Sequence, residues 1–212
     1  MRAPRVGLIL VALLVVCFAR GSRAAPSRPR QRVPEWVRQR NNGTLWFREY
    51  SRNLQAIERV NAQKDPADVL VYGDSITAWS KPTDLSRLPG SRRYFDRWLG
   101  APLVSEPLGI PGDEIAHLGW RLIVGKELPR KDPRNVILFI GINDIVHGLQ
   151  TEDILSRMDS LLGFVTQRMP STKVLLQLLL PSHAGRWKRC CRGLCLLARS
   201  SGWPAGSLVV TC

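Results

Sequence analysis

Acidic residues are scarce in this chain of 212 residues, and its last stretch has none. The sequence contains 17 Asp and Glu against 31 Lys and Arg, which gives a formal net charge of +14, and residues 182–212 contain no Asp or Glu at all. Such a charge favours anionic neighbours, among them acidic polysaccharide, lipid surfaces and nucleic acid. No basic stripe with interleaved aromatic residues accompanies the motifs described below, so nucleic acid is not an expected partner.

Histidine and paired cysteines are also rare. The three histidines are His117, His147 and His183, and four of the five cysteines lie after residue 189. Those four cysteines could form two disulfides, in any of three pairings, in an oxidising compartment. They lack the paired C-x-x-C spacing of structural zinc sites, so no metal site is expected. The more favoured interpretation of the tail over 182–212 is an unstructured segment.

The chain has no apolar run long enough to span a bilayer comfortably. The longest, residues 6–18, follows Arg2 and Arg5 and precedes the small-x-small sequence Ser22-Arg23-Ala24. This order is typical of a cleaved secretory signal. We therefore expect a signal peptide over residues 1–24, a secreted mature protein, and no stable membrane insertion after cleavage.

The mature chain should begin with a flexible basic segment, residues 25–44. Its first part is rich in Pro and Arg and has no apolar periodicity. Asn42-Gly43-Thr44 is a glycosylation sequon, usable only in a secretory pathway that performs this chemistry, which makes Asn42 a candidate modification site.

Residues 45–181 have the length and patterning of one domain with a single core. Apolar residues recur at helical or strand intervals, and the segments alternate along the chain. Such alternation predicts right-handed βαβ units in a three-layer sandwich. The expected elements are a helix over 45–62, a strand over 69–72, a helix within 83–99, a short strand over 103–106, a helix over 113–128, a strand over 135–140, a helix over 151–169 and a strand over 173–180.

The domain is organised around residues 68–77, where an apolar strand ends abruptly in Gly73-Asp74-Ser75. Ser75 is thereby placed at the carboxyl end of a central strand and at the start of a helix, where open α/β sheets bind ligands. A hydroxyl at this position suits a serine nucleophile. The simpler alternative is that Asp74 and Ser75 only cap the helix.

Two later segments carry similar turns. Leu108-Gly109-Ile110-Pro111-Gly112-Asp113 follows the second strand, and Gly141-Ile142-Asn143-Asp144 follows the third. In order and spacing, these segments and Gly73-Asp74-Ser75 resemble the first three motif blocks of the SGNH (GDSL-type) hydrolase family. Between them, residues 117–122 and 125–128 are similar to the platelet-activating-factor acetylhydrolase branch.

The resemblance implies a flavodoxin-like three-layer α/β fold and hydrolysis of small acyl esters of carbohydrates or lipids, without a cofactor. It implies that Ser75 is the nucleophile and that Asp74 belongs to the site. It also implies that the backbone N–H groups of Ser75 and Gly109 and the side chain of Asn143 form the oxyanion hole. Pro107 stands two residues before Gly109, where family members often carry Asn, so that turn must be held differently.

The main departure from the family comes after Pro181. Members of the family continue through a further helix and strand to an Asp-x-x-His motif that supplies the base and its orienting carboxylate, whereas residues 182–212 contain no acid. We therefore expect the fold to lack its last strand and helix, which would leave the strand over 173–180 as an exposed apolar edge.

Without that motif the serine lacks its usual base. Candidate surrogate bases are His147 and His183; His117 is more consistent with a surface or packing role. Asp144-Ile145-Val146-His147 spells Asp-x-x-His, but it lies in the loop after the third block rather than at the family's triad motif.

The function expected from the sequence is therefore a secreted serine esterase that is impaired by the missing base. Two alternatives stay open: a non-catalytic ligand-binding module, and a truncated isoform without function. Labelling by a reactive-serine probe would separate the first alternative from an enzyme. The oligomeric state cannot be predicted from these residues.

Overall fold

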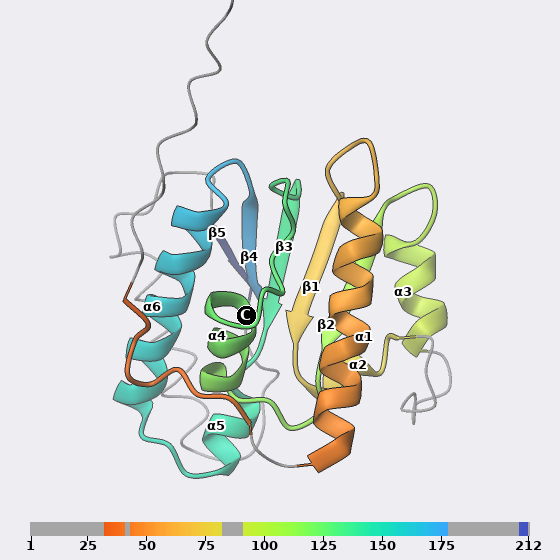
Figure 1. Cartoon of the computed structure of the whole chain (residues 1–212). Coiled ribbons are helices and arrows are strands. Elements are labelled where there is room, and N and C mark those ends of the chain that lie inside the picture. Colours follow the sequence, from red (N-terminus) through yellow and green to blue (C-terminus); the bar gives the residue numbers. More distant parts are fainter. Residues whose placement is uncertain (1–31, 41–42, 82–90, 178–207, 212) are drawn as a thin grey trace, which may run out of the picture. The chain divides into compact units, whose positions relative to one another are not determined.

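A computed structural model describes residues 32–40, 43–81, 91–177 and 208–211 of the chain (Figure 1). Residues Val33–Cys212 form one compact unit. The helices of its described part are α1 (Gly43–Asn61), α2 (Ser75–Ala78), α3 (Ser91–Leu99), α4 (Ile115–Ile123), α5 (Ile142–Val146) and α6 (Thr151–Arg168). The strands are β1 (Val69–Gly73), β2 (Ser105–Gly109), β3 (Asn135–Phe139), β4 (Lys173–Gln177) and β5 (Leu208–Thr211).

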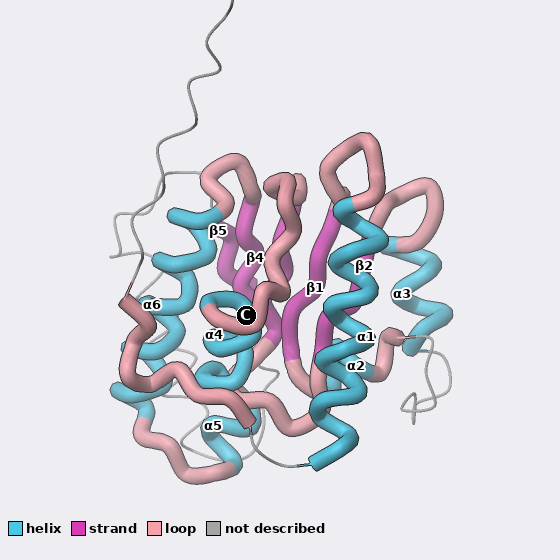
Figure 2. The backbone as a smooth tube through the Cα atoms, viewed as in Figure 1, coloured by secondary structure: helices cyan, strands magenta, loops and turns pink. Residues whose placement is uncertain are grey.

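The strands form one parallel sheet in the order β2-β1-β3-β4-β5 (Figure 2). β1 lies between β2 and β3, so Gly73 at its end is paired with Gly109 on one side and with Phe139 on the other. Because the strands are parallel, the loops after β1, β2 and β3 leave the sheet at the same edge. This arrangement confirms the predicted α/β class with a parallel sheet.

The core lies between the sheet and the helices that stand in front of it in Figure 1, α1, α4 and α6. Each helix contributes an apolar stripe, as its periodicity predicts. Leu70 and Tyr72 of β1 and Leu138 of β3 are fully buried beneath them. Other members of the core are Ala56, Ile57 and Val60 of α1, Ile115, Leu118 and Leu122 of α4, and Ile154, Met158, Leu161, Leu162 and Val165 of α6.

The sheet does not end at β4. The expectation that the fold lacks its last strand is wrong on this point, because β5 (Leu208–Thr211) pairs with β4 in parallel, with Leu175 opposite Val209. Three of its four residues are Leu or Val, which suit a strand, and their pairing satisfies backbone groups that β4 would otherwise expose. The missing helix of the family pattern falls on residues 178–207, outside the described residues.

Other boundaries differ from the prediction by a few residues. β2 begins two residues later than expected and continues to Gly109, so the second motif starts inside the strand. α4 ends at Ile123 rather than near residue 128, where the N–H groups of Val124 and Gly125 both bond to the Trp120 carbonyl. α5 was not predicted, because its five residues lie within a motif that reads as a turn.

Residues 33–40, part of the segment predicted to be flexible, have specific contacts with α4. The Arg38 N–H donates to the Ala116 carbonyl at 3.4 Å. The Trp36 ring covers Gly119, where a Cβ atom would lie only 2.6 Å from it. A glycine at this position of α4 therefore lets the N-terminal segment pack closely on the helix.

Candidate active site

Ser75 occupies the first position of α2, directly after β1. Asp74 is the N-cap of this short helix, and its carboxylate accepts a hydrogen bond from the Ile76 N–H at 2.9 Å. Ser75 itself is half-buried. The sequence-based placement of Ser75, at a strand end and a helix start, is thus confirmed, and the capping role that was weighed as an alternative belongs to Asp74.

Asp74 is almost completely buried, and its Oδ2 atom has no hydrogen-bond partner within the described part of the chain. Burial raises the pKa of its carboxyl group to about 6, against the hydrogen bond from Ile76, which lowers it. A carboxyl group with this pKa changes its charge near neutral pH, next to the predicted nucleophile.

Two glycines allow the strand ends to approach α2. A Cβ atom on Gly109 would lie 2.3 Å from the Ala78 nitrogen and 2.4 Å from the Asp74 carbonyl oxygen. A Cβ atom on Gly73 would lie 2.2 Å from Thr77 Oγ1. Because any side chain at Gly109 would meet backbone atoms, glycine is required there for β2 to end against the helix that carries Ser75.

Asn143 lies on α5, which begins after Gly141 at the end of β3. Gly141 has a φ angle of 116°, a conformation that suits glycine and turns the chain out of the strand. Asn143 Nδ2 donates to the Asp113 carbonyl at 2.7 Å. The side-chain amide has two N–H donors, and this hydrogen bond uses one of them.

The predicted site residues therefore follow three neighbouring strands: Ser75 after β1, Gly109 at the end of β2, and Asn143 after β3. Parallel pairing brings these three strand ends to one edge of the sheet. Acyl transfer requires a serine with N–H donors close to it, and these strand ends bring the residues that could supply them to the same edge of the sheet.

His147 ends α5, and its partner is a carboxylate that the sequence analysis did not single out. The distance from His147 Nδ1 to Glu114 Oε1 is 2.7 Å, and the histidine side chain is 56% exposed. Arg38 donates to the other oxygen of Glu114 at 2.6 Å. Asp144 is not the partner of His147, because its Oδ2 accepts from the Ile115 N–H. The Asp-x-x-His spelling at 144–147 is thus not a catalytic pair.

His117 is buried at the start of α4, in agreement with the predicted packing role. Its Nδ1 atom accepts a hydrogen bond from the Glu114 N–H at 3.0 Å, which forms half of a capping box. Burial lowers the pKa of its imidazole to about 4, against the pull of Glu114. The neutral ring is the form that can accept this bond.

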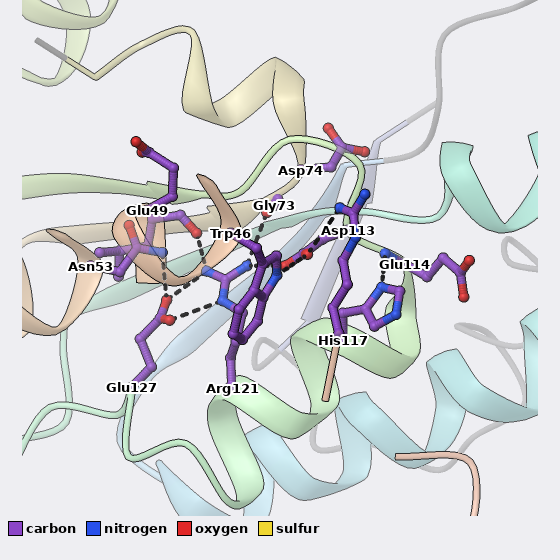
Figure 3. Close-up of polar contacts among 12 residues, drawn as sticks. Trp46, Glu49, Asn53, Gly73, Asp74, Asp113, Glu114, His117, Arg121 and Glu127 are labelled. Carbon is purple, nitrogen blue, oxygen red and sulfur yellow. Dashed lines mark hydrogen bonds and ion pairs between the residues drawn. The ribbon is translucent and has the colours of Figure 1, made fainter. Parts of the chain in front are cut away.

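A buried charged cluster lies behind the turns, and the sequence analysis missed it as a unit (Figure 3). At its centre is Arg121, whose side chain is fully buried between Asp113 and Glu127. Trp46 Nε1 donates to Asp113 Oδ1 at 2.8 Å, and Asn53 Nδ2 donates to Glu127 Oε1 at 3.1 Å. The signal that could have revealed it was present, since Arg121 and Glu127 both lie in the segments that resemble the acetylhydrolase branch.

Several predicted features lie outside the described residues. They are His183, the sequon residue Asn42, the signal peptide over 1–24 and the tail cysteines. Among the described residues, no helix combines the length and apolar character needed to cross a membrane.

The family model of the GDSL-like lipase/acylhydrolase family matches residues 71–200, more than half of the chain. The chain belongs to this family. The matched region begins within β1 and contains all three motif blocks, which confirms the resemblance inferred from Ser75, Gly109 and Asn143.

Curated relatives include subunits of platelet-activating factor acetylhydrolase IB. The human alpha2 subunit is 29% identical over 118 residues, which cover 56% of this chain and 45% of that subunit. The human alpha1 subunit is 34% identical over 85 residues, covering 40% of this chain and 36% of the subunit. The chain thus matches less than half of the length of these relatives.

Solved structures share the fold. AlinE4, an SGNH-hydrolase family esterase, superimposes with a TM-score of 0.52 at 19% identity, covering 70% of this chain and 77% of AlinE4. At this identity the likeness concerns the fold alone.

Proposed function

We propose that this chain is a secreted serine ester hydrolase of reduced activity, acting on short acyl esters, such as acetyl esters, of carbohydrates or lipids. The observation that carries the proposal is the convergence of Ser75, Gly109 and Asn143 on the ends of three neighbouring strands. Family membership and the acetylhydrolase names of the relatives support the reaction class.

In the proposed reaction, the Ser75 hydroxyl attacks the ester carbonyl and loses its proton to a base. The carbonyl oxygen becomes negative and is stabilised by the N–H groups of Ser75 and Gly109 and by Asn143, each worth about 3 kcal/mol in comparable sites. The alcohol leaves with the proton, and water then hydrolyses the acyl group from Ser75 by the same route.

The base that takes the proton from Ser75 is not supplied by an Asp-x-x-His motif in residues 182–212, and we assign it to His147. Its Nδ1 faces the Glu114 carboxylate, an arrangement that orients an imidazole and leaves Nε2 as the basic atom. Burial acts to raise the pKa of Glu114, but hydrogen bonds from His147 and Arg38 outweigh it and hold that pKa below its usual range. Glu114 therefore stays ionised and can stabilise a protonated ring.

Reduced activity is part of the proposal because residues 182–212 contain no Asp or Glu and so no Asp-x-x-His motif. His147 is also more than half exposed, which constrains it less than a buried triad histidine. The same absence favours a second candidate function, a module that binds an ester or its product without cleaving it.

A fluorophosphonate probe tests the proposal on the mature chain. Covalent labelling that is lost in Ser75→Ala and reduced in His147→Gln supports the hydrolase with this base. Labelling that is lost in Ser75→Ala but unchanged in His147→Gln would retain the nucleophile and remove His147 from the reaction. Binding of an acetylated sugar without any labelling would favour the binding module.

Secretion is tested separately by expression in a eukaryotic cell. The proposal expects the protein in the medium with an N-terminus at Ala25. Retention in the cell with residues 1–24 still attached would contradict it.

A further inference from the structure

The fully buried guanidinium of Arg121 uses every one of its five N–H donors. Nε and Nη2 bind the two oxygens of Glu127 at 2.9 and 2.5 Å. Nη1 binds Asp113 Oδ2 at 2.9 Å and the Gly73 carbonyl at 3.2 Å. Nη2 also binds the Leu108 carbonyl. The carboxylates hold the plane of the guanidinium from two sides, and its two terminal nitrogens each reach one backbone carbonyl (Figure 3).

The two carbonyls lie at the ends of β1 and β2, next to the predicted site residues. Gly73 ends β1 and is separated from Ser75 only by Asp74. The Leu108 carbonyl is part of the same peptide group as the Gly109 N–H, the predicted oxyanion donor. That peptide is trans, because the only cis bond in the described part of the chain is Ala101-Pro102. The planar peptide therefore fixes the direction of the Gly109 N–H once the Leu108 carbonyl is held.

Arg121 does not act as a source of positive potential. Its charge is offset by Asp113 and Glu127, both within hydrogen-bond distance. Its effect on the site must pass through the hydrogen bonds themselves. A charged donor on a carbonyl polarises the whole peptide group and strengthens its N–H as a donor.

We propose that Arg121 is a positioning residue that sets the Gly109 N–H relative to Ser75, by holding the Gly73 and Leu108 carbonyls with the adjacent nitrogens of one rigid group. Its catalytic consequence rests on the proposed esterase function; its effect on the Gly109 peptide does not. Lysine cannot replace it, because a single ammonium lacks the planar fork that spans two carbonyls.

The variant is Arg121→Lys, and the matched control is Lys81→Met. Lys81 is also a buried cation; it binds Glu49 Oε2 at 3.2 Å, and no contact to either carbonyl involves it. The measurement is the amide resonance of Gly109 and the carbonyl ¹³C resonances of Leu108 and Gly73 in the full chain. In Arg121→Lys we expect all three to shift toward the values of a weaker hydrogen bond, and in Lys81→Met we expect them to stay in place.

Kinetics supply the second readout. With a short-chain acetyl ester, Arg121→Lys should lower kcat about 10²-fold while KM changes little, because the misplaced donor acts on the transition state. Loss of general stability would instead lower the folded fraction and affect Lys81→Met as well. If the wild-type chain shows no hydrolysis, the esterase proposal fails, and the NMR comparison still decides the role of Arg121.

Glu127→Gln is a second variant in case Arg121→Lys does not fold. It keeps Arg121 in the chain but weakens the bidentate contact that orients it. The same three resonances should move in the same direction by a smaller amount. Unchanged Gly109, Leu108 and Gly73 resonances in whichever variant folds would overturn the proposal.

Discussion

Asp113 and Glu114 are consecutive buried carboxylates whose partners differ in exposure and whose pKa values shift in opposite directions. Asp113 is completely buried and binds Arg121 and Trp46, and burial raises its pKa to about 6 in spite of Arg121. Glu114 is also largely buried, but it binds His147 and Arg38, whose side chains are more than half exposed, and its pKa is lowered. Asp113 thus binds the buried Arg121 behind the site, whereas Glu114 binds the exposed imidazole of His147, the proposed base. The chain separates the two tasks at a single peptide bond.

Substitution of Asp113 should have the largest effect on the stability of the fold. Asp113→Asn turns an amide N–H2 toward one of the two buried donors that Asp113 now binds, Arg121 and Trp46, and should lower the free energy of unfolding by about 2–3 kcal/mol. Glu114→Gln should cost less than about 1 kcal/mol, because its partners Arg38 and His147 are more than half exposed and can bind water instead. Urea denaturation at neutral pH measures both. Equal losses in the free energy of unfolding would show that the two carboxylates contribute equally to stability.

The roles of His147 and Glu114 are tested through activity. His147→Gln should lower ester hydrolysis about 10²-fold and Glu114→Gln about 10-fold, since a general base contributes at least the first amount and its orienting carboxylate less. Arg130→Gln, in an exposed ion pair with Glu58, is the control and should leave the rate unchanged. If His147→Gln retained the wild-type rate, another group would have to be the base.

Two glycines compare the backbone packing near Ser75 with the packing elsewhere in the chain. Gly109→Ala would place a Cβ against backbone atoms of Ala78 and Asp74 and should destabilise the fold by about 2 kcal/mol. Gly163→Ala is the matched control: its Cβ would meet nothing within 4 Å inside α6, and it should stabilise the fold by about 0.5–1 kcal/mol. Thermal denaturation compares them, and a gain in Tm for Gly109→Ala would contradict the close approach.

The smallest expected effect is a pH dependence of the free energy of unfolding that comes from His117, which accepts a hydrogen bond from the Glu114 N–H. The pKa of His117 is about 4 in the folded chain and ordinarily about 6.5. As the pH is lowered, this imidazole is therefore protonated in the unfolded chain before it is protonated in the folded chain. Stability from this group is present above pH 6.5 and is lost as the pH falls toward 4, by about 1–2 kcal/mol. Asp74 and Asp144, with pKa values that burial raises to about 6, act in the opposite direction.

A difference measurement isolates His117 from these carboxyl groups. Gln at this position keeps an acceptor for the Glu114 N–H but does not titrate. The stability of the wild type relative to His117→Gln should therefore fall as the pH is lowered from 6.5 to 4. A constant difference over this range would mean that His117 is protonated equally in the folded and unfolded chains.

The sequence predicted the fold where its signals are local and periodic. The apolar run before Gly73 placed β1 and Ser75, and the motifs placed Gly109 and Asn143 at neighbouring strand ends. It could not predict the contacts that depend on tertiary approach. Arg121 looks like an ordinary helix residue until Asp113 and Glu127 are seen around it, and His147 appears paired with Asp144 until Glu114 is found at 2.7 Å.

β5 shows a second limit. Leu208–Thr211 carries apolar residues of strand type, but four residues near the end of a segment rich in Arg and Cys are too short a pattern to predict a strand. These residues form a strand because they pair with the edge of β4, and that edge exists only once the rest of the sheet has assembled.

We propose Ser75 as the nucleophile of an ester-hydrolysing site in this chain. The most direct measurement is hydrolysis of a short-chain chromogenic acetyl ester by the purified mature chain beside its Ser75→Ala variant, with folding of both verified by circular dichroism. We expect slow but measurable hydrolysis that falls to the buffer rate in Ser75→Ala. Equal rates for two folded proteins would contradict it and leave the motifs as a scaffold without this chemistry.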